Sequence, residues 1–198
     1  MKNLGTKSKD TLKPQGLKSL VRSYDLIGDI AIVHAQKRLD SQERAIGQSI
    51  MQTHKHVKTV LLQVGAVAGT FRLRHLKWIA GEEKTETLYK EFGCFFKVDL
   101  QQCYFSPRLS FERMRIAKMV KPSEIILNMF AGVGSFSILM AKHGKAETVY
   151  SIDLNPTAIR YMKENIRLNR VQGHVVPILG DAEQIIAENL QNVADRVV

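Results

Sequence analysis

A glycine-containing turn between two apolar segments carries the clearest chemical pattern in the sequence. The run Ile125–Asn128 is typical of a buried strand, the chain then passes through Ala131-Gly132-Val133-Gly134, and apolar residues resume at helical spacing from Phe136. Glycine lets a backbone approach a ligand closely, and the first N–H groups of a helix can bind a polar or anionic group. The pattern therefore predicts a strand, a ligand-binding turn and a helix.

Two acidic residues follow the ends of the next two expected strands. Asp153 ends a strand over 148–153, where an acidic residue can accept hydrogen bonds from both ribose hydroxyls. Asp181 follows a strand over 174–179, where a carboxylate could accept from an adenine amino group. Ser137 stands at the third glycine position of a dinucleotide-binding loop, so the NAD fingerprint is not matched. Each motif alone is also common at ordinary turns, but their order predicts a nucleoside-cofactor site.

The same order of loop, ribose acceptor and base acceptor resembles the S-adenosylmethionine site of Rossmann-like methyltransferases. The segments Tyr104–Leu109, Glu112-Arg113, Asn128–Ile138 and Ile152–Pro156 are similar to those of the archaeal and eukaryotic tRNA (guanine-37-N1)-methyltransferase family. The resemblance runs from about Tyr24 to Val198. It implies a small α+β domain followed by an α/β, Rossmann-like class I methyltransferase domain. It also implies S-adenosyl-L-methionine as the cofactor and the anticodon loop of tRNA as the partner.

The resemblance further implies roles for individual residues. Glu112 would be the general base that removes the N1 proton of guanine, while Arg108 and Arg72 would hold or polarise the guanine and its phosphates. The residues expected to bind the cofactor are Arg113, Phe130, Ala131, Gly132, Gly134, Asp153, Leu154, Asp181 and Ala182.

The residue types themselves leave two alternatives open at the basic positions. Glu112 lies among arginines. These arginines could keep its carboxylate ionised near the cofactor loop, or one of them could simply form an i,i+3 salt bridge with it on a helix. Arg72 and Arg74 would share one face of an expected strand over 71–78, either as a phosphate-binding stripe or as a solvated face.

Composition indicates a polyanionic partner. The chain has 29 Lys and Arg against 19 Asp and Glu, a net charge of +10, which favours nucleic acid. Cys94 and Cys103 lack metal-ligand spacing and are expected to be reduced and partly buried, and no metal site is expected. The sequence has no signal-peptide core and no apolar run of about eighteen residues. We expect a cytoplasmic monomer without a membrane span.

The chain divides into three expected parts: a basic flexible tail over 1–23, a small α+β domain on the RNA side over 24–100, and the N-terminal part of the methyltransferase domain over 101–198. Within them, the sequence suggests a β segment over 24–34 kinked at Gly28, and helices capped by Ser41, Ser110 and Asn155. Residues 87–92 and 94–98 suit either two arms around Gly93 or one bent strand.

The resemblance suggests an incomplete catalytic domain. A fourth strand is expected to begin near Ala194, and the family's Asn-Leu-Pro motif would follow it. We therefore expect the isolated chain to be poorly stable and inactive. Two alternatives to the methyltransferase stay open: the aminocarboxypropyl transferase of wybutosine synthesis and a non-catalytic RNA-binding fragment. Pro107-Arg108-Leu109 resembles the methylating branch, because the other branch tends to have Gly-Asn in place of Pro-Arg.

Overall fold

The computed structural model describes residues 21–35 and 42–198. Most of the basic tail expected over 1–23 and the N-cap expected at Ser41 lie outside the described residues.

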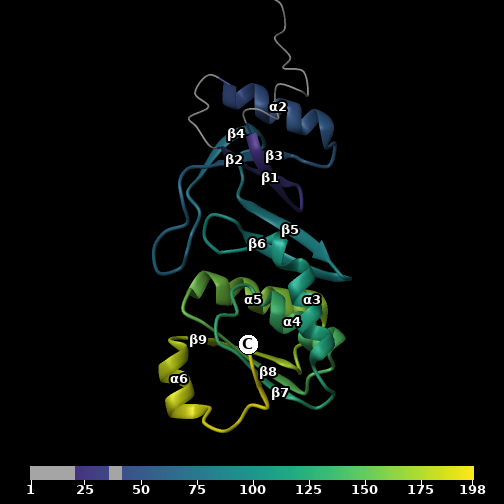
Figure 1. Cartoon of the computed structure of the whole chain (residues 1–198), viewed down its shortest axis with the longest axis vertical. Coiled ribbons are helices and arrows are strands. Elements are labelled where there is room, and N and C mark those ends of the chain that lie inside the picture. The colour runs from purple at the N-terminus through teal and green to yellow at the C-terminus, as the bar shows by residue number, and fades with distance from the viewer. Residues whose placement is uncertain (1–20, 36–41) are drawn as a thin grey trace, which may run out of the picture.

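Four strands form the first sheet, in the order β1-β2-β3-β4 (Figure 1). They are β1 (Val21–Ile27), β2 (Ile30–Ala35), β3 (Thr59–Gln63) and β4 (Leu76–Gly81), and only β2 and β3 are parallel. Parallel neighbours need a crossover connection, and α2 (Glu43–Thr53) lies in it. Ile46 and Ile50 of α2 pack with Val33 and Val60 of the sheet. This part confirms the small α+β domain.

The segment over 24–34 is a hairpin, so the expectation of one kinked strand is wrong. β1 and β2 pair antiparallel across a turn at Gly28-Asp29. Gly28 has a φ of +58°, and a Cβ at this position would lie 2.2 Å from Thr87 Oγ1. A side chain is therefore excluded from the turn. A glycine inside a β pattern indicates a kink or a turn equally well, which is why the sequence did not distinguish them.

A second hairpin lies between the two sheets (Figure 1). β5 (Glu86–Glu91) and β6 (Cys94–Asp99) pair antiparallel around Phe92-Gly93, as the two-arm alternative predicted. The hairpin packs on α5 (Pro156–Asn169). Asn165 and Asn169 of that helix each bond a backbone N–H and a backbone carbonyl of β6, at 2.6–3.0 Å. The two asparagines thus bind the edge of the hairpin to the helix.

The second sheet is fully parallel, with the order β10-β7-β8-β9. Its strands are β7 (Ile125–Asn128), β8 (Thr148–Asp153), β9 (Val175–Leu179) and β10 (Arg196–Val197). The remaining elements are the 3₁₀ turn η2 (Pro107–Leu109), α3 (Ser110–Met119), α4 (Ser135–His143) and α6 (Ala182–Asn189). Alternating strands and helices confirm the Rossmann-like prediction, including the strand expected to begin near Ala194.

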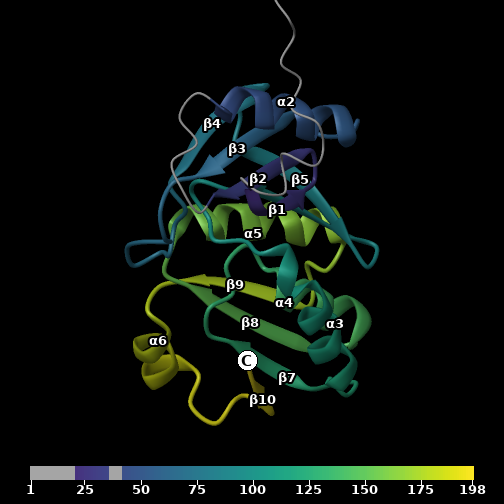
Figure 2. The ribbon, with the colours of Figure 1, turned by 45° about the horizontal axis from the view of Figure 1, so that its top comes forward.

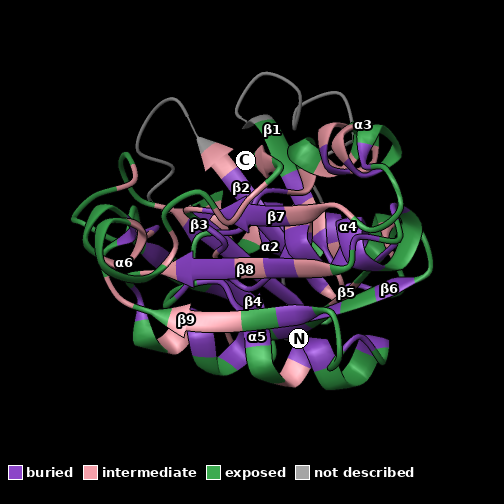
Figure 3. Ribbon diagram, turned by 90° about the horizontal axis from the view of Figure 1, so that it is seen from below, coloured by how far each residue is buried: buried purple, intermediate pink, exposed green. Residues whose placement is uncertain are grey.

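Both faces of the parallel sheet are covered. Ile126 and Val149 share a core with α4 and α5, whereas Leu127 and Ile152 pack against α6 on the opposite face. Figure 3 shows how much of β7 and β8 is buried as a result. Burial on both faces is typical of parallel strands.

The two parts of the chain share one hydrophobic core. Ile27 and Leu61 of the first sheet, Phe96 of the hairpin and Ile138 of α4 belong to a single buried cluster. Figure 2 shows α5 lying between the parallel sheet and the elements of the small domain. The small domain is therefore packed against the methyltransferase-like part. No helix in the described part of the chain has the length and apolar character needed to cross a membrane.

Candidate functional site

The glycine turn after β7 is shaped by two residues with positive φ. Gly132 has a φ of +55° and Gly134, the N-cap of α4, a φ of +86°. A Cβ at Gly134 would lie 2.7 Å from Met162 Cγ, so this glycine allows α4 to pack closely on α5. A Cβ at Gly132 would have one atom within 4 Å, Tyr104 O at 3.9 Å. Gly132 therefore keeps the backbone open on its cavity side.

Asp153 fixes the turn to the end of β8. Its Oδ2 accepts a hydrogen bond from Gly132 N at 2.7 Å, and its Oδ1 accepts one from Asn155 N at 2.9 Å. The side chain of Asn155 accepts from Thr157 N and Ala158 N, which confirms the predicted cap of α5. One carboxylate thus positions both ligand-facing turns.

Ser137 explains why the loop differs from a dinucleotide-binding loop. Asn128 Nδ2 donates to Ser137 Oγ at 3.0 Å, and Ser151 Oγ donates to the same oxygen at 2.8 Å. All three side chains are buried. A third glycine would leave the buried Asn128 Nδ2 without this acceptor, at a cost of about 1–3 kcal/mol for an unsatisfied group. Ser151 Oγ also lies 3.1 Å from Val149 O and could donate there instead.

The three strand ends line one cavity of about 330 Å³. Of the residues proposed for the site, the cavity contains Arg72, Phe130, Gly132, Asp153, Leu154, Asp181 and Ala182. Ala131 and Gly134 belong to the same turn but are not part of the lining. Asp181 caps α6, with its Oδ1 accepting from Gln184 N at 3.1 Å. Sequence reasoning missed Thr70, Phe71, Tyr104 and Met129, which complete the wall from other segments.

Arg72 and Arg74 do not share a strand face, so that expectation is wrong. β4 begins only at Leu76, and Arg72 lies in a turn with a φ of +51°, its N–H donating to Gly69 O at 3.0 Å. Arg72 is exposed and lines the cavity, whereas Arg74 is buried. The pairing of Ala68 with Leu73 closes a small loop that the alternating pattern could not reveal.

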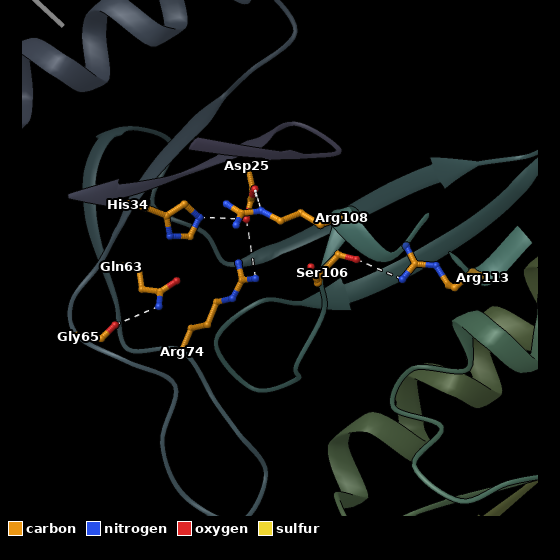
Figure 4. Close-up of polar contacts among 8 residues, drawn as sticks. All are labelled: Asp25, His34, Gln63, Gly65, Arg74, Ser106, Arg108 and Arg113. Carbon is orange, nitrogen blue, oxygen red and sulfur yellow. Dashed lines mark hydrogen bonds and ion pairs between the residues drawn. The ribbon is translucent and has the colours of Figure 1, made fainter. Parts of the chain in front are cut away.

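Arg108 belongs to a cluster around Asp25, shown in Figure 4. Arg108 Nε donates to Asp25 Oδ1 at 2.9 Å, while His34 Nε2 lies 3.0 Å and Arg74 Nη2 4.0 Å from Asp25 Oδ2. Burial by itself raises the pKa of Asp25, but the hydrogen bonds from His34 and Arg108 outweigh it and lower the pKa below 3.8. Arg108 is 61% exposed, so its terminal nitrogens remain accessible.

Arg113 lies outside the cavity. It is 1% exposed and forms a two-bond ion pair with Glu91 of β5, while its Nη1 donates to Ser106 O at 3.1 Å. Its guanidinium also lies 5.2 Å from the Phe105 ring centroid. These contacts join α3 to the second hairpin. The expected cofactor contact of Arg113 stays a prediction.

Glu112 also lies outside the cavity lining. On α3 its two carboxylate oxygens each accept a hydrogen bond from Arg115 at 2.7 Å, which is the i,i+3 salt bridge of the second alternative. The hydrogen bond from Arg115 lowers the pKa of Glu112. Its side chain is 43% exposed. Ser110 is the first residue of α3 and makes no cap hydrogen bond, because the preceding turn η2 runs directly into the helix.

Comparison with known proteins identifies the family. Residues 87–198 match the model of the TRM5/TYW2 methyltransferase domain, and residues 8–85 match the TYW2 N-terminal domain. The chain belongs to the TRM5/TYW2 family. The chain is 47% identical over 186 residues to the tRNA (guanine(37)-N(1))-methyltransferase Trm5b of Pyrococcus abyssi. This match covers 93% of the chain and 54% of that relative, so the chain spans about half of its length.

The name of a second TRM5/TYW2 relative describes a different reaction. The tRNA(Phe) (4-demethylwyosine(37)-C(7)) aminocarboxypropyltransferase of Methanocaldococcus jannaschii is 41% identical, covering 88% of this chain and 66% of the relative. The two identities are close. Overall identity therefore leaves the reaction undecided between the two branches.

Several solved structures of the family contain ligands, and two of them are compared with this chain. The complex of aTrm5 with tRNALeu has a TM-score of 0.81 and 37% identity, covering 93% of this chain and 53% of that one. The M. jannaschii TYW2 structure in complex with AdoMet has a TM-score of 0.63 and 34% identity, covering 88% of this chain and 63% of that one. Members of the TRM5/TYW2 family thus bind AdoMet.

Among residues 21–35 and 42–198, no group of three or more His, Cys, Asp or Glu side chains could hold a metal ion.

Proposed function

We propose that the chain binds S-adenosylmethionine and belongs to an enzyme that methylates N1 of guanine-37 in the anticodon loop of tRNA. The observation that carries this proposal is that the ends of β7, β8 and β9 line one shared cavity, with Asp153 and Asp181 in its wall. The carboxyl ends of parallel strands are where open α/β sheets bind ligands.

The charges and donors of the cavity favour a nucleoside with a cationic group over a dinucleotide. Gly132 N, the amide that could bind a phosphate, already donates to Asp153. Two carboxylates in the wall would repel a pyrophosphate but suit ribose hydroxyls, an adenine amino group and a nearby sulfonium. When bound, S-adenosylmethionine supplies a methyl group that its sulfonium makes electrophilic.

The reaction requires a base and a stabiliser of negative charge. Guanine N1 carries a proton, and we assign its removal to Glu112, whose half-exposed carboxylate would have to leave Arg115 to act. As the proton leaves, negative charge develops on O6, which a guanidinium can stabilise. Arg72 in the cavity wall and Arg108, whose side chain is 61% exposed, are the candidates.

The aminocarboxypropyl transfer is the second candidate function. It uses the same cofactor on the same tRNA position, and the name of the M. jannaschii relative supports it. The ion pair between Arg108 and Asp25 favours methylation, because the Asn that tends to replace Arg in the other branch could not make this charged contact. A non-catalytic RNA-binding fragment is the third alternative.

Product analysis tests the proposal. The protein in its complete natural form is incubated with labelled S-adenosylmethionine and a tRNA transcript containing G37, and the nucleosides are separated. We expect 1-methylguanosine, and we expect Glu112→Gln to reduce the rate by about 100- to 10,000-fold, the usual contribution of a general base. Glu147→Gln, an exposed substitution before β8, should leave the rate unchanged.

An aminocarboxypropyl product would overturn the reaction but keep the cofactor site. Equal activity of the Glu112→Gln variant and the wild type would remove Glu112 as the base. Tight tRNA binding without cofactor binding would favour the RNA-binding fragment.

A further inference from the structure

A second hollow lies beside the cofactor cavity, between α5 and the edge strand β9. It has a volume of about 370 Å³. Its wall includes Pro156 and Leu179, the chain neighbours of Asn155 and Gly180 in the first cavity. Figures 2 and 3 both show β9 alongside α5, and the two elements are in contact. We call this hollow the α5–β9 groove.

Three cationic side chains line the α5–β9 groove. Arg160, Lys163 and Arg167 lie three and four residues apart on α5, so they share one face of the helix. All three are exposed, and none makes a salt bridge within the described part of the chain. From Arg160 to Arg167 the helix rises about 10 Å, at 1.5 Å per residue. The row is therefore long enough to face more than one phosphate of a nucleic-acid strand.

The acidic residue in the wall does not cancel these charges. Among the described residues that line the groove, Glu164 is the only one with a carboxylate, and its Oε2 lies 3.2 Å from Lys97 Nζ. Lys97 Nζ also lies 3.3 Å from Glu86 Oε1, so it compensates Glu164 only in part. Three cations of α5 against one carboxylate still leave the groove with an excess positive charge. The low-dielectric protein wall of a groove concentrates the positive potential of these side chains in the groove, which attracts anions.

The groove does not suit an added β-strand. Pro177 lies in the middle of β9, and it cannot donate the backbone hydrogen bond that strand addition would require at this edge. Exposed arginines and a lysine instead suit phosphate oxygens, which arginine binds with two parallel N–H donors.

We propose that the α5–β9 groove binds the phosphodiester backbone of the RNA strand next to the target nucleotide. The inference rests on the proposed function, because a nucleotide that reaches the cofactor cavity must bring its flanking strand to the same edge of the sheet. Arg160, Lys163 and Arg167 contact phosphates and position the strand. They contribute affinity without reading the base.

Salt dependence of binding tests the inference. The probe is an anticodon stem-loop transcript containing G37, and its dissociation constant is measured between 50 and 200 mM salt, the range over which phosphate contacts change affinity most visibly. We expect the triple variant R160Q/K163Q/R167Q to reduce the slope of log K against log salt by about 2 to 3 units, since each lost phosphate contact contributes roughly 0.7 to 0.9.

Two control variants show whether the effect depends on the position and the charge of the three side chains, and a third measurement shows whether the fold is intact. K118Q/K121Q/K145Q removes the same charge from exposed sites near the amino ends of β7 and β8, and its slope should change by less than about 1 unit. R160K/R167K keeps both charges, so it should retain the wild-type slope if the triple variant acts through charge. Unchanged S-adenosylmethionine affinity in all variants would show that the cofactor cavity is intact.

Equal slope changes in the two triple variants would overturn the inference, as would an unchanged slope in R160Q/K163Q/R167Q. If R160Q/K163Q/R167Q changed the salt slope for whole tRNA but not for the stem-loop, the inference would also be overturned, because the contact would then lie far from the target nucleotide. Failure of the wild type to bind either RNA would contradict the proposed function itself.

Discussion

Asp25 links a histidine and two arginines at the junction of the small domain and η2. The side chains of His34, Arg74 and Arg108 all face its carboxylate. Even His34, the nearest of the three in the sequence, lies nine residues from Asp25. Arg74 is buried, and its Nη1 has no hydrogen-bond partner among the described residues. Removing the carboxylate would therefore leave a buried guanidinium uncompensated, which is costly in a protein interior.

Asp25 should make the stability of the fold depend on pH. Its folded-state pKa lies below the unfolded value of 3.8, so its contribution is present above about pH 4 and is lost as the pH falls through the lower folded value. We expect Asp25→Asn to reduce the free energy of unfolding by about 2 kcal/mol at pH 7. The difference from the wild type should shrink below pH 4.

Denaturant unfolding at several pH values measures this difference. Glu83→Gln, at an exposed site, serves as the control for loss of a carboxylate. A difference for Asp25→Asn that stays constant from pH 7 to pH 3 would contradict the assignment.

Sequence patterns could predict some site residues and not others. Asp153 and Asp181 were found because each follows an apolar strand and precedes a helix, which is a local signal. Asp25 carries no such signal, since its bond to Arg108 spans 83 residues of chain. The placement of Arg72 in the cavity wall also depends on a turn that the alternating pattern of its segment concealed.

At the scale of elements, the second hairpin is held by a buried ion pair. Glu91 of β5 and Arg113 of α3 have side chains only 3% and 2% exposed. The hairpin was one of two alternatives that Gly93 and its flanking segments left open. Its contact with α3 and α5 was not predictable, because Glu91, Asn165 and Asn169 look like ordinary polar residues until the packing removes them from solvent.

Breaking this ion pair should destabilise the fold strongly. Glu91→Gln leaves the Arg113 guanidinium buried without a charged partner, and we expect a loss of about 3–5 kcal/mol in the free energy of unfolding. Glu124→Gln breaks the partly exposed pair with Arg196 and should cost about 1 kcal/mol or less. Denaturant unfolding of both variants measures the two losses, and similar values would show that burial of the Glu91–Arg113 pair contributes little.

At the scale of the whole molecule, one hydrophobic core joins the small domain to the parallel sheet, and the cavity proposed for the cofactor lies where the two parts meet. Thr70, Phe71 and Arg72 of the small domain face Phe130, Asp153 and Asp181 at the ends of the parallel strands. The alternation of strands and helices in this part followed from the sequence, because each βα unit carries its own pattern. The small domain's share of the cavity did not, since it depends on contacts between distant segments.

The most direct test of the central claim is the binding of S-adenosylmethionine to the protein in its complete natural form by isothermal titration calorimetry, with NAD as the comparison ligand. We expect S-adenosylmethionine to bind and NAD not to bind. We expect Asp181→Asn to weaken the binding of S-adenosylmethionine roughly 10- to 100-fold, because the variant loses the hydrogen bond between the adenine amino group and a charged carboxylate. Asparagine caps helices as well as aspartate, so α6 should be retained. Binding of NAD, or unchanged affinity in Asp181→Asn, would contradict the account.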